Sequence, residues 1–284
     1  MARKLKAPVR RGKDNKKPAY SLRDATLSLL DGAIETLGSR QNDEAVHTAR
    51  KAAKRIRAAL RLLRESLGSR SYHRENRGIR DAAKPLTAVR DAFILRKTLG
   101  TIPKRPLPLE RGLESEYQLE RQNLEHQGLQ AALTQLKTTR KDLSQLSPVV
   151  PEAASVIAGV GNTYRAGRKA LAHAKTNGDQ ALHEWRKQAK YLLNQLELLR
   201  AVYGVNVRKL RRRADKLAEI LGDDHDLSVL SGKLRHYHAG TPRLIKHIEK
   251  RRRRLQRCAA RQGKKLYRHS TKHIQATIAA HLRS

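Results

Sequence analysis

The chain has 284 residues, in which 62 Lys and Arg outnumber 26 Asp and Glu, so its formal net charge is +36. A charge of this size exceeds what solubility requires and attracts polyanions without specificity. Aromatic residues make up only 4% of the chain, which argues against the class of proteins that bind single-stranded RNA by stacking its bases.

Cysteine content and hydropathy argue against disulfide-linked, membrane-spanning and secreted proteins. Cys258 is the single cysteine, so neither an intramolecular disulfide nor a thiolate metal centre can form, which suits a reducing cytoplasm. No apolar run approaches the ~18 residues of a membrane span, and the charged N-terminus does not resemble a signal peptide. We therefore expect a cytoplasmic protein with no membrane partner.

The chain is expected to begin with a disordered basic arm over residues 1–18, where eight Lys or Arg occur without a hydrophobic period. Two interpretations of this arm stay open, a solvated tail and a weak auxiliary contact with phosphate. Apolar residues at near-helical spacing then predict a first helix over 20–37. Asn42 or Asp43 is expected to cap the next helix.

The stretch 45–64 predicts a strongly amphipathic helix that continues to about Leu67. At about 100° per residue, its basic side chains fall in one sector and its apolar side chains on the opposite side. We call the basic sector the first basic face, and its residues are His47, Arg50, Lys51, Lys54, Arg57 and Arg61. The face is roughly 25 Å long and suits an extended polyanion.

A further helix is expected over 72–99, with a kink at Pro85, because proline lacks the backbone N–H and clashes with the preceding turn. Arg74 and Arg77 lie on its charged side and are candidate phosphate ligands. A proline-rich connector over 101–108 precedes a long helix over 110–146, whose first half is acidic. These acids are expected to cover an outer face near a helix N-terminus, with a catalytic or metal role as the alternative.

Pro148 and Pro151 mark the clearest boundary in the chain. The order of four helices appears again after it, over 152–175, 179–203, 206–238 and 241–281. Amphipathic helices joined by short loops favour antiparallel bundles. We therefore expect an all-α protein of two four-helix bundles, over 19–147 and 148–284.

The basic helix recurs 136 residues on, where the spacing H-x-x-R-K-x-x-K is repeated. We call this copy the second basic face, and its residues are His183, Arg186, Lys187 and Lys190. Tyr191, Leu193 and Glu197 stand where the first copy has Arg55, Arg57 and Arg61, so the second face carries less charge. For His47 and His183 two roles stay open, an imidazole bonded across a helix interface and a phosphate ligand.

Basic residues also lie along the last two predicted helices. Arg208 and Arg212 oppose apolar residues in the helix over 206–238. A stripe over 243–272 steps by three or four residues, and its candidate ligands are Lys250, Arg254, Arg257 and Arg261. The stripe is either a solvated face or an anion-binding face, and the mutual repulsion of its charges favours the second interpretation.

Motifs for catalysis and for metal binding are missing. No GxxxxGK[ST], GxGxxG, HExxH or GxSxG pattern occurs, which removes local support for nucleotide hydrolysis, dinucleotide chemistry and common hydrolases. The histidine pairs lack carboxylate or thiolate partners at ligand spacing. We therefore expect no enzyme activity, no cofactor and no metal site.

Each motif helix is followed about 40 residues later by a segment that contains an aspartate, Asp91 in LTAVRDAFIL and Asp226 in LAEILGDDHDLSVL. Together these features resemble the CHAD domain, an all-helical domain named for its histidines, over about residues 19–284. The resemblance implies two four-helix bundles related by internal duplication and approximate two-fold symmetry. It also implies a basic central surface that binds inorganic polyphosphate.

The function that we expect is non-enzymatic binding of inorganic polyphosphate, with association of the protein with polyphosphate granules. The first alternative is a nucleic-acid-binding protein that coats DNA or structured RNA as a non-specific polyanion. The second is an enzyme that acts on phosphoanhydrides.

Overall fold

The computed structural model describes residues 21–39, 42–102, 107–174, 178–237 and 240–283. Helices dominate these ranges and no strand occurs in them, which confirms the all-α prediction. The predicted arm over 1–18 lies outside the described residues. Within the described ranges, no helix is both long and apolar enough to cross a membrane.

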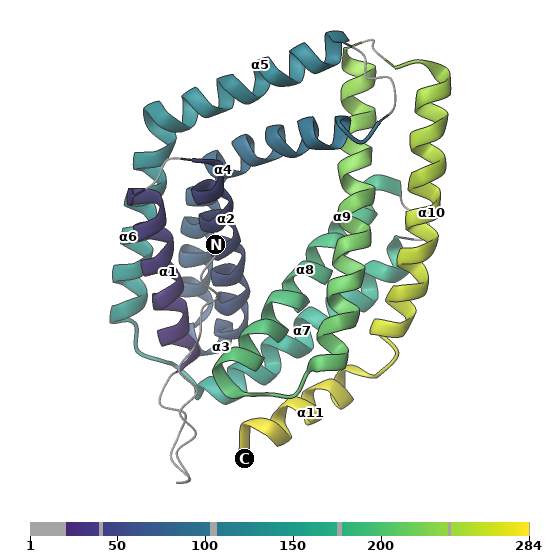
Figure 1. The fold of residues 1–284 in the computed structure, drawn as a ribbon. Coiled ribbons are helices and arrows are strands. Elements are labelled where there is room, and N and C mark those ends of the chain that lie inside the picture. Colours follow the sequence, from purple (N-terminus) through teal and green to yellow (C-terminus); the bar gives the residue numbers. More distant parts are fainter. Residues whose placement is uncertain (1–20, 40–41, 103–106, 175–177, 238–239, 284) are drawn as a thin grey trace.

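The helices of the first half are α1 (Leu22–Ser39), α2 (Asp43–Leu62), α3 (Arg64–Leu67), α4 (Ser69–Leu99), α5 (Leu107–Asn123), the π-helical segment η1 (Leu124–Gly128) and α6 (Leu129–Gln145). The helices of the second half are α7 (Glu152–His173), α8 (Gly178–Tyr203), α9 (Arg208–His236), α10 (Pro242–Leu266) and α11 (Thr271–Arg283). Figure 1 shows their arrangement as a ring, with α4 and α5 reaching from one side of the molecule to α9 on the other.

The predicted apolar side of the first basic helix is confirmed as core. Asn42 caps α2 by accepting a hydrogen bond from the backbone N–H of Ala45. Ala49, Ala53 and Ile56 are buried, and α2 packs against α1 and α4. The expected continuous helix to Leu67 is wrong, because α2 ends at Leu62 and the short α3 follows after Leu63.

Two bends lie side by side in the first half. Helix α4 continues through Pro85 and changes direction along its length (Figure 1). The expected single helix over 110–146 is wrong, because η1 separates α5 from α6, as π-helical turns often do where a helix is distorted. Gly128 lies so close to Pro85 that a Cβ added at Gly128 would stand 2.8 Å from the proline Cβ. The absence of a side chain at Gly128 therefore allows the two bends to pack together.

The bends direct the second half of α4 and the start of α5 toward α9 and α10. The contact is a small hydrophobic cluster, made of Leu95, Leu99, Ile102, Leu109 and Leu113 from the first half and of Leu227, Leu230, Leu234 and Ile248 from the second. A larger cluster also contains residues of both halves, such as Ile56 and Leu196. The boundary at 147/148, the duplication and the two-fold relationship stay predictions.

In the second half, α8 packs against α7 and α9, and α10 packs against α9. The expected helix over 241–281 is wrong, because α10 ends at Leu266 and α11 begins at Thr271. The hydroxyl of Tyr164 explains the break, since it donates toward the backbone carbonyls of Leu266 and His269, both at 3.1 Å. These contacts give a partner to the last carbonyl of α10, which has none within the helix, and to one carbonyl of the connection to α11.

Candidate anion-binding site

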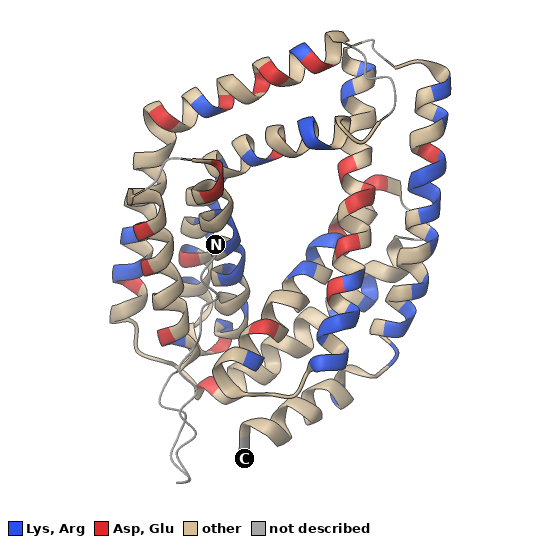
Figure 2. Ribbon diagram, in the orientation of Figure 1, with Lys and Arg blue, Asp and Glu red and all other residues tan. Residues whose placement is uncertain are grey.

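The two predicted basic faces lie on neighbouring helices. Helix α2 carries the first face, helix α8 carries the second, and the two helices pack against each other. Figure 2 shows Lys and Arg residues along both helices. The four residues Arg50, Lys54, Arg186 and Lys190 act on one another electrostatically across this helix pair, and we call them the central cations.

Each motif arginine faces the aspartate that follows it in the sequence. Arg50 Nη2 lies 2.8 Å from Asp91 Oδ1, and Arg50 Nε donates to Thr87 Oγ1 at 3.1 Å. Arg186 Nη2 lies 3.9 Å from Asp226 Oδ1 in the second copy. The two aspartates therefore orient the arginines and neutralise part of their charge.

The two motif lysines lack such carboxylates. Within the described part of the chain, neither Lys54 nor Lys190 forms an ion pair. Burial, together with the charges of Arg50, Lys190 and Arg186, lowers the pKa of Lys54 to about 7. Burial also lowers the pKa of Lys190, together with Arg186 and Arg50. Lys54 has protein atoms on several sides while much of its surface stays open to water, so an anion can reach it.

The two motif histidines have different surroundings. His183 Nδ1 lies 3.4 Å from Nδ1 of His225 on α9, which is a contact across a helix interface, as one of the two predicted roles requires. Among the described residues His47 has no hydrogen-bond partner, and it is exposed. Burial and neighbouring cations lower the pKa of both histidines, and they lower the pKa of His225 to about 4. These imidazoles are therefore neutral at pH 7 when no anion is bound.

The less basic positions of α8 contact arginines of α2. Arg61 places its Cζ 3.7 Å from the ring centroid of Tyr191, a cation–π contact. Arg55 forms an ion pair with Glu197 at 3.5 Å. Tyr191 occupies the position equivalent to Arg55, and Glu197 the position equivalent to Arg61, so the two contacts are reciprocal. The remaining arginine of the first face, Arg57, donates to Asn76 Oδ1 at 3.0 Å.

Other predicted ligands lie outside this cluster. Arg74 pairs with Glu75 at 2.6 Å and with Asp142 of α6 at 3.6 Å. Lys187 pairs with Glu184 on its own helix at 2.6 Å. The other predicted ligands are exposed on four helices: Lys51 on α2, Arg77 on α4, Arg208 and Arg212 at the start of α9, and Lys250, Arg254, Arg257 and Arg261 on α10.

The sequence analysis missed one partly buried ion cluster near this site. Arg252 Nη2 lies 2.5 Å from Asp179 Oδ1 at the start of α8, and Arg252 Nε lies 3.2 Å from Asp224 Oδ1 of α9. Asp224 is only 3% exposed and also accepts a hydrogen bond from Gln256. The helical period could have identified Arg252 as an inward-facing residue, because position 252 falls on the side of α10 that carries Ile248 and Leu255.

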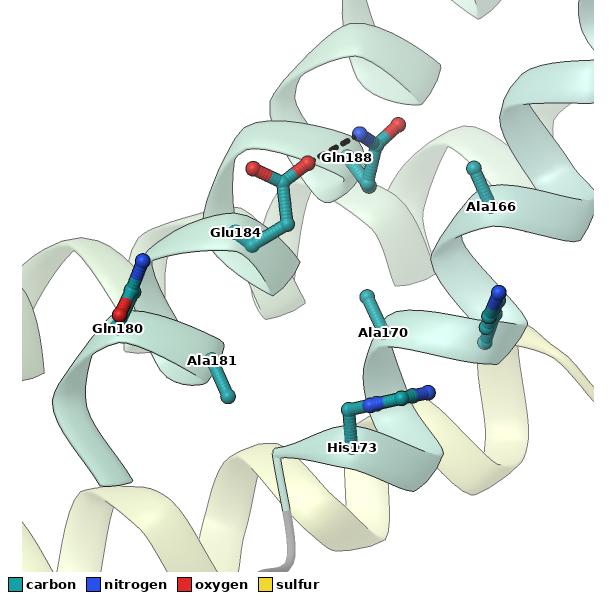
Figure 3. Close-up of a pocket in the computed structure, with 8 residues that line it drawn as sticks. Ala166, Ala170, His173, Gln180, Ala181, Glu184 and Gln188 are labelled. Atoms are coloured by element: carbon teal, nitrogen blue, oxygen red, sulfur yellow. Dashed lines mark hydrogen bonds between the residues drawn. The ribbon is translucent and has the colours of Figure 1, made fainter. Parts of the chain in front are cut away.

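A separate hollow of about 480 Å³ lies between α7 and α8 (Figure 3). Its lining residues are Ala166, Lys169, Ala170, His173, Gln180, Ala181, Glu184 and Gln188. Glu184 accepts a hydrogen bond from Gln188, drawn as the dashed line in Figure 3. None of the central cations lines this hollow, so it is not part of the candidate site. In the described ranges, no group of three or more metal-ligating side chains comes together.

Comparison with known proteins assigns the chain to a family. The sequence profile of the CHAD domain matches residues 24–235, and the chain therefore belongs to the CHAD family. A search of the solved structures matches the crystal structure of the CHAD domain from the plant Ricinus communis. The two chains are 19% identical, each is covered over 97% of its length, and the TM-score is 0.58. This likeness shows the fold. A search of the curated proteins finds no match.

Proposed function

We propose that this protein binds inorganic polyphosphate without catalysing a reaction, and that the central cations on α2 and α8 form the heart of the binding surface. The observation that carries the proposal is the meeting of four cations from two helices, of which only the two arginines form ion pairs among the described residues, with Asp91 and Asp226. An anion placed there relieves the repulsion that lowers the pKa of Lys54. The polyphosphate binding implied for CHAD domains supports the same ligand.

The chemistry of the side chains suits a phosphate polymer. Arginine can donate two parallel hydrogen bonds to phosphate oxygens, and lysine acts as a point charge. Polyphosphate presents the same charge at every repeat, so binding requires no fixed register and no group that recognises a base. Affinity comes from several contacts and from the release of counterions. A protein bound in this way would be carried to polyphosphate granules in the cytoplasm.

A competition experiment tests the proposal against nucleic acid. Labelled polyphosphate is bound to the protein and challenged with unlabelled polyphosphate or with duplex DNA at equal phosphate concentration. We expect polyphosphate to compete more strongly, and stronger competition by DNA would favour the nucleic-acid alternative. A chelator should leave binding intact, because the contacts proposed are direct.

A phosphate-release assay addresses the enzyme alternative. The protein is incubated with polyphosphate in the presence and absence of Mg²⁺, and free phosphate is measured over time. We expect no release above that of a buffer control. Release that is lost in a variant of the central cations would contradict the non-enzymatic part of the proposal.

A further inference from the structure

Helix α10 carries a row of exposed cations on the side that faces away from the rest of the fold. The row consists of Arg243, Lys246, Lys250, Arg254, Arg257, Arg261 and Lys264, all of them exposed. The buried residues of α10 include Ile248, Ala259 and Leu266. At about 100° per residue, the row lies about 180° around the helix from these residues. Figure 2 shows the Lys and Arg residues along α10 at the edge of the molecule.

The cations of the row have almost no acidic partner in the described part of the chain. Glu249 is the one acid on α10, and it pairs at 3.9 Å with Arg253 beside the row. Arg252 shows the contrast, because it lies on the inner side of the same helix and binds Asp179 and Asp224. Like charges three or four residues apart on a helix repel each other. An external anion is therefore the counter-charge that this row lacks.

The row is separate from the central cations. The inner side of α10 contacts α9, and it also contacts α8 at Gly263, where an added Cβ would lie 2.4 Å from the Trp185 ring. The row points away from both helices, whereas the central cations lie where α8 meets α2. A polymer segment that contacts the central cations therefore does not contact the row at the same point. The CHAD match also ends at residue 235, before α10 begins.

We propose that this row is a second polyphosphate-binding face, so that one protein molecule can hold two polymer chains together. The proposal rests on the function proposed above. The row suits a single thin polymer, because its charges follow one line with about one residue per 5.4 Å turn. A DNA duplex presents two phosphate strands on either side of a groove, and a single line of charges on one helix matches only one of them.

A two-polymer capture experiment tests this inference. Long polyphosphate is fixed to a surface by one end, the full-length protein is bound to it, and fluorescent polyphosphate is added in solution. We expect wild-type protein to recruit the fluorescent polymer. The variant with Lys250→Gln, Arg254→Gln, Arg257→Gln and Arg261→Gln should recruit at least five-fold less per bound protein, while its capture on the surface falls less. The matched control, which replaces four exposed cations of α4 and α6, is Arg70→Gln, Lys97→Gln, Lys137→Gln and Lys141→Gln, and it should recruit like wild type.

The outcomes distinguish the second face from the function proposed above. Recruitment by the α10 variant at the wild-type level would overturn the second face, and so would an equal loss in the control variant. Capture of wild-type protein without recruitment would overturn the second face and leave polyphosphate binding standing. Failure of wild-type capture would remove both. If fluorescent duplex DNA is recruited more strongly than polyphosphate at equal phosphate, the row is a nucleic-acid face and the proposal is wrong.

Discussion

Arg61 of α2 lies over the ring of Tyr191 of α8, with 3.7 Å between the guanidinium carbon and the ring centroid. Tyr191 stands at the position of Arg55 in the first copy of the motif, and Arg55 itself pairs with Glu197, which stands at the position of Arg61. The two residues that replace arginines in the second copy, Tyr191 and Glu197, are thus the partners of Arg61 and Arg55 on α2. Without them, arginines of both copies would face each other across the helix pair.

This relationship predicts that an arginine at position 191 lowers the stability of the protein and strengthens its binding of polyphosphate. Tyr191→Arg removes a cation–π contact worth about 0.5–1 kcal/mol and adds repulsion with Arg61, so we expect a loss of about 1–2 kcal/mol in unfolding free energy. The added cation should tighten polyphosphate binding several-fold at low salt. Denaturant unfolding and fluorescence titration measure the two quantities.

The control for this variant is Tyr191→Leu, which removes the same contact without adding charge. It should lose about 0.5–1 kcal/mol and gain no affinity. If both substitutions bind polyphosphate equally, Tyr191 does not adjoin the binding surface.

Replacing the two central lysines should give a protein that is more stable but binds polyphosphate less tightly. Lys54→Gln with Lys190→Gln removes two cations that repel Arg50 and Arg186 and that form no ion pair with a described residue. Each like-charge neighbour pair on a helix costs about 0.2–0.5 kcal/mol, so the double variant should gain on the order of 1 kcal/mol in the absence of anions. Denaturant unfolding in low-phosphate buffer measures the gain. A loss of stability would show that the lysines hold the fold together.

The lowered pKa of Lys54 predicts how stability depends on pH. Its pKa is about 7 in the folded protein, against 10.5 for an ordinary lysine, so the unfolded chain binds more protons between these values. The unfolding free energy should therefore rise with pH from about 7 to about 10, and the penalty should be fully present below pH 7. Lys54→Gln should lack this rise, and unfolding curves at several pH values compare the two proteins.

Binding should reverse the same shift. A phosphate polymer beside Lys54 favours the ammonium form, so the complex should take up as much as one proton per protein at pH 8. Calorimetry in two buffers of different ionisation enthalpy measures this uptake. Equal heats in both buffers would contradict a contact between Lys54 and the polymer.

The cluster around Arg252 predicts a stability effect that is separate from polymer contact. Arg252→Met leaves Asp224 buried without its cation, and breaking a buried ion pair costs about 3–5 kcal/mol. Adding Asp224→Asn removes the unpaired charge and should restore part of the loss. Thermal or denaturant unfolding of the single and double variants tests this, and additive losses would show that the two residues do not depend on each other.

Sequence periodicity was sufficient for the faces of individual helices. The positions of Ala49, Ala53 and Ile56 in the core follow from the 3.6-residue period of α2, and so does the opposite placement of the basic residues. The same period would have placed Arg252 on the inner side of α10. The sequence analysis followed only the stripe that includes Lys250 and Arg254, and it gave Arg252, which stands between them, no role.

Contacts between distant segments were beyond such patterns. The break after Leu62 involves Ser155 of α7, whose hydroxyl donates to the carbonyl of Leu62 at 2.8 Å and accepts from the N–H of Ser66 at 3.1 Å. No proline or glycine marks the break after Leu266, where Tyr164 supplies the hydrogen bonds. The pairing of Arg61 with Tyr191 likewise depends on how two helices pack and not on the period of either one.

The salt dependence of polyphosphate binding tests the central claim most directly, because it counts the cations that contact the polymer. On a flexible single-stranded polyanion, each contact contributes about −0.7 to the slope of log affinity against log salt concentration. We predict that Lys54→Gln with Lys190→Gln makes the slope shallower by about 1.4, since two contacts are lost. The control Lys137→Gln with Lys141→Gln should keep the wild-type slope, and an equal change in both variants would show that net charge, and not the pairing of α2 with α8, determines binding.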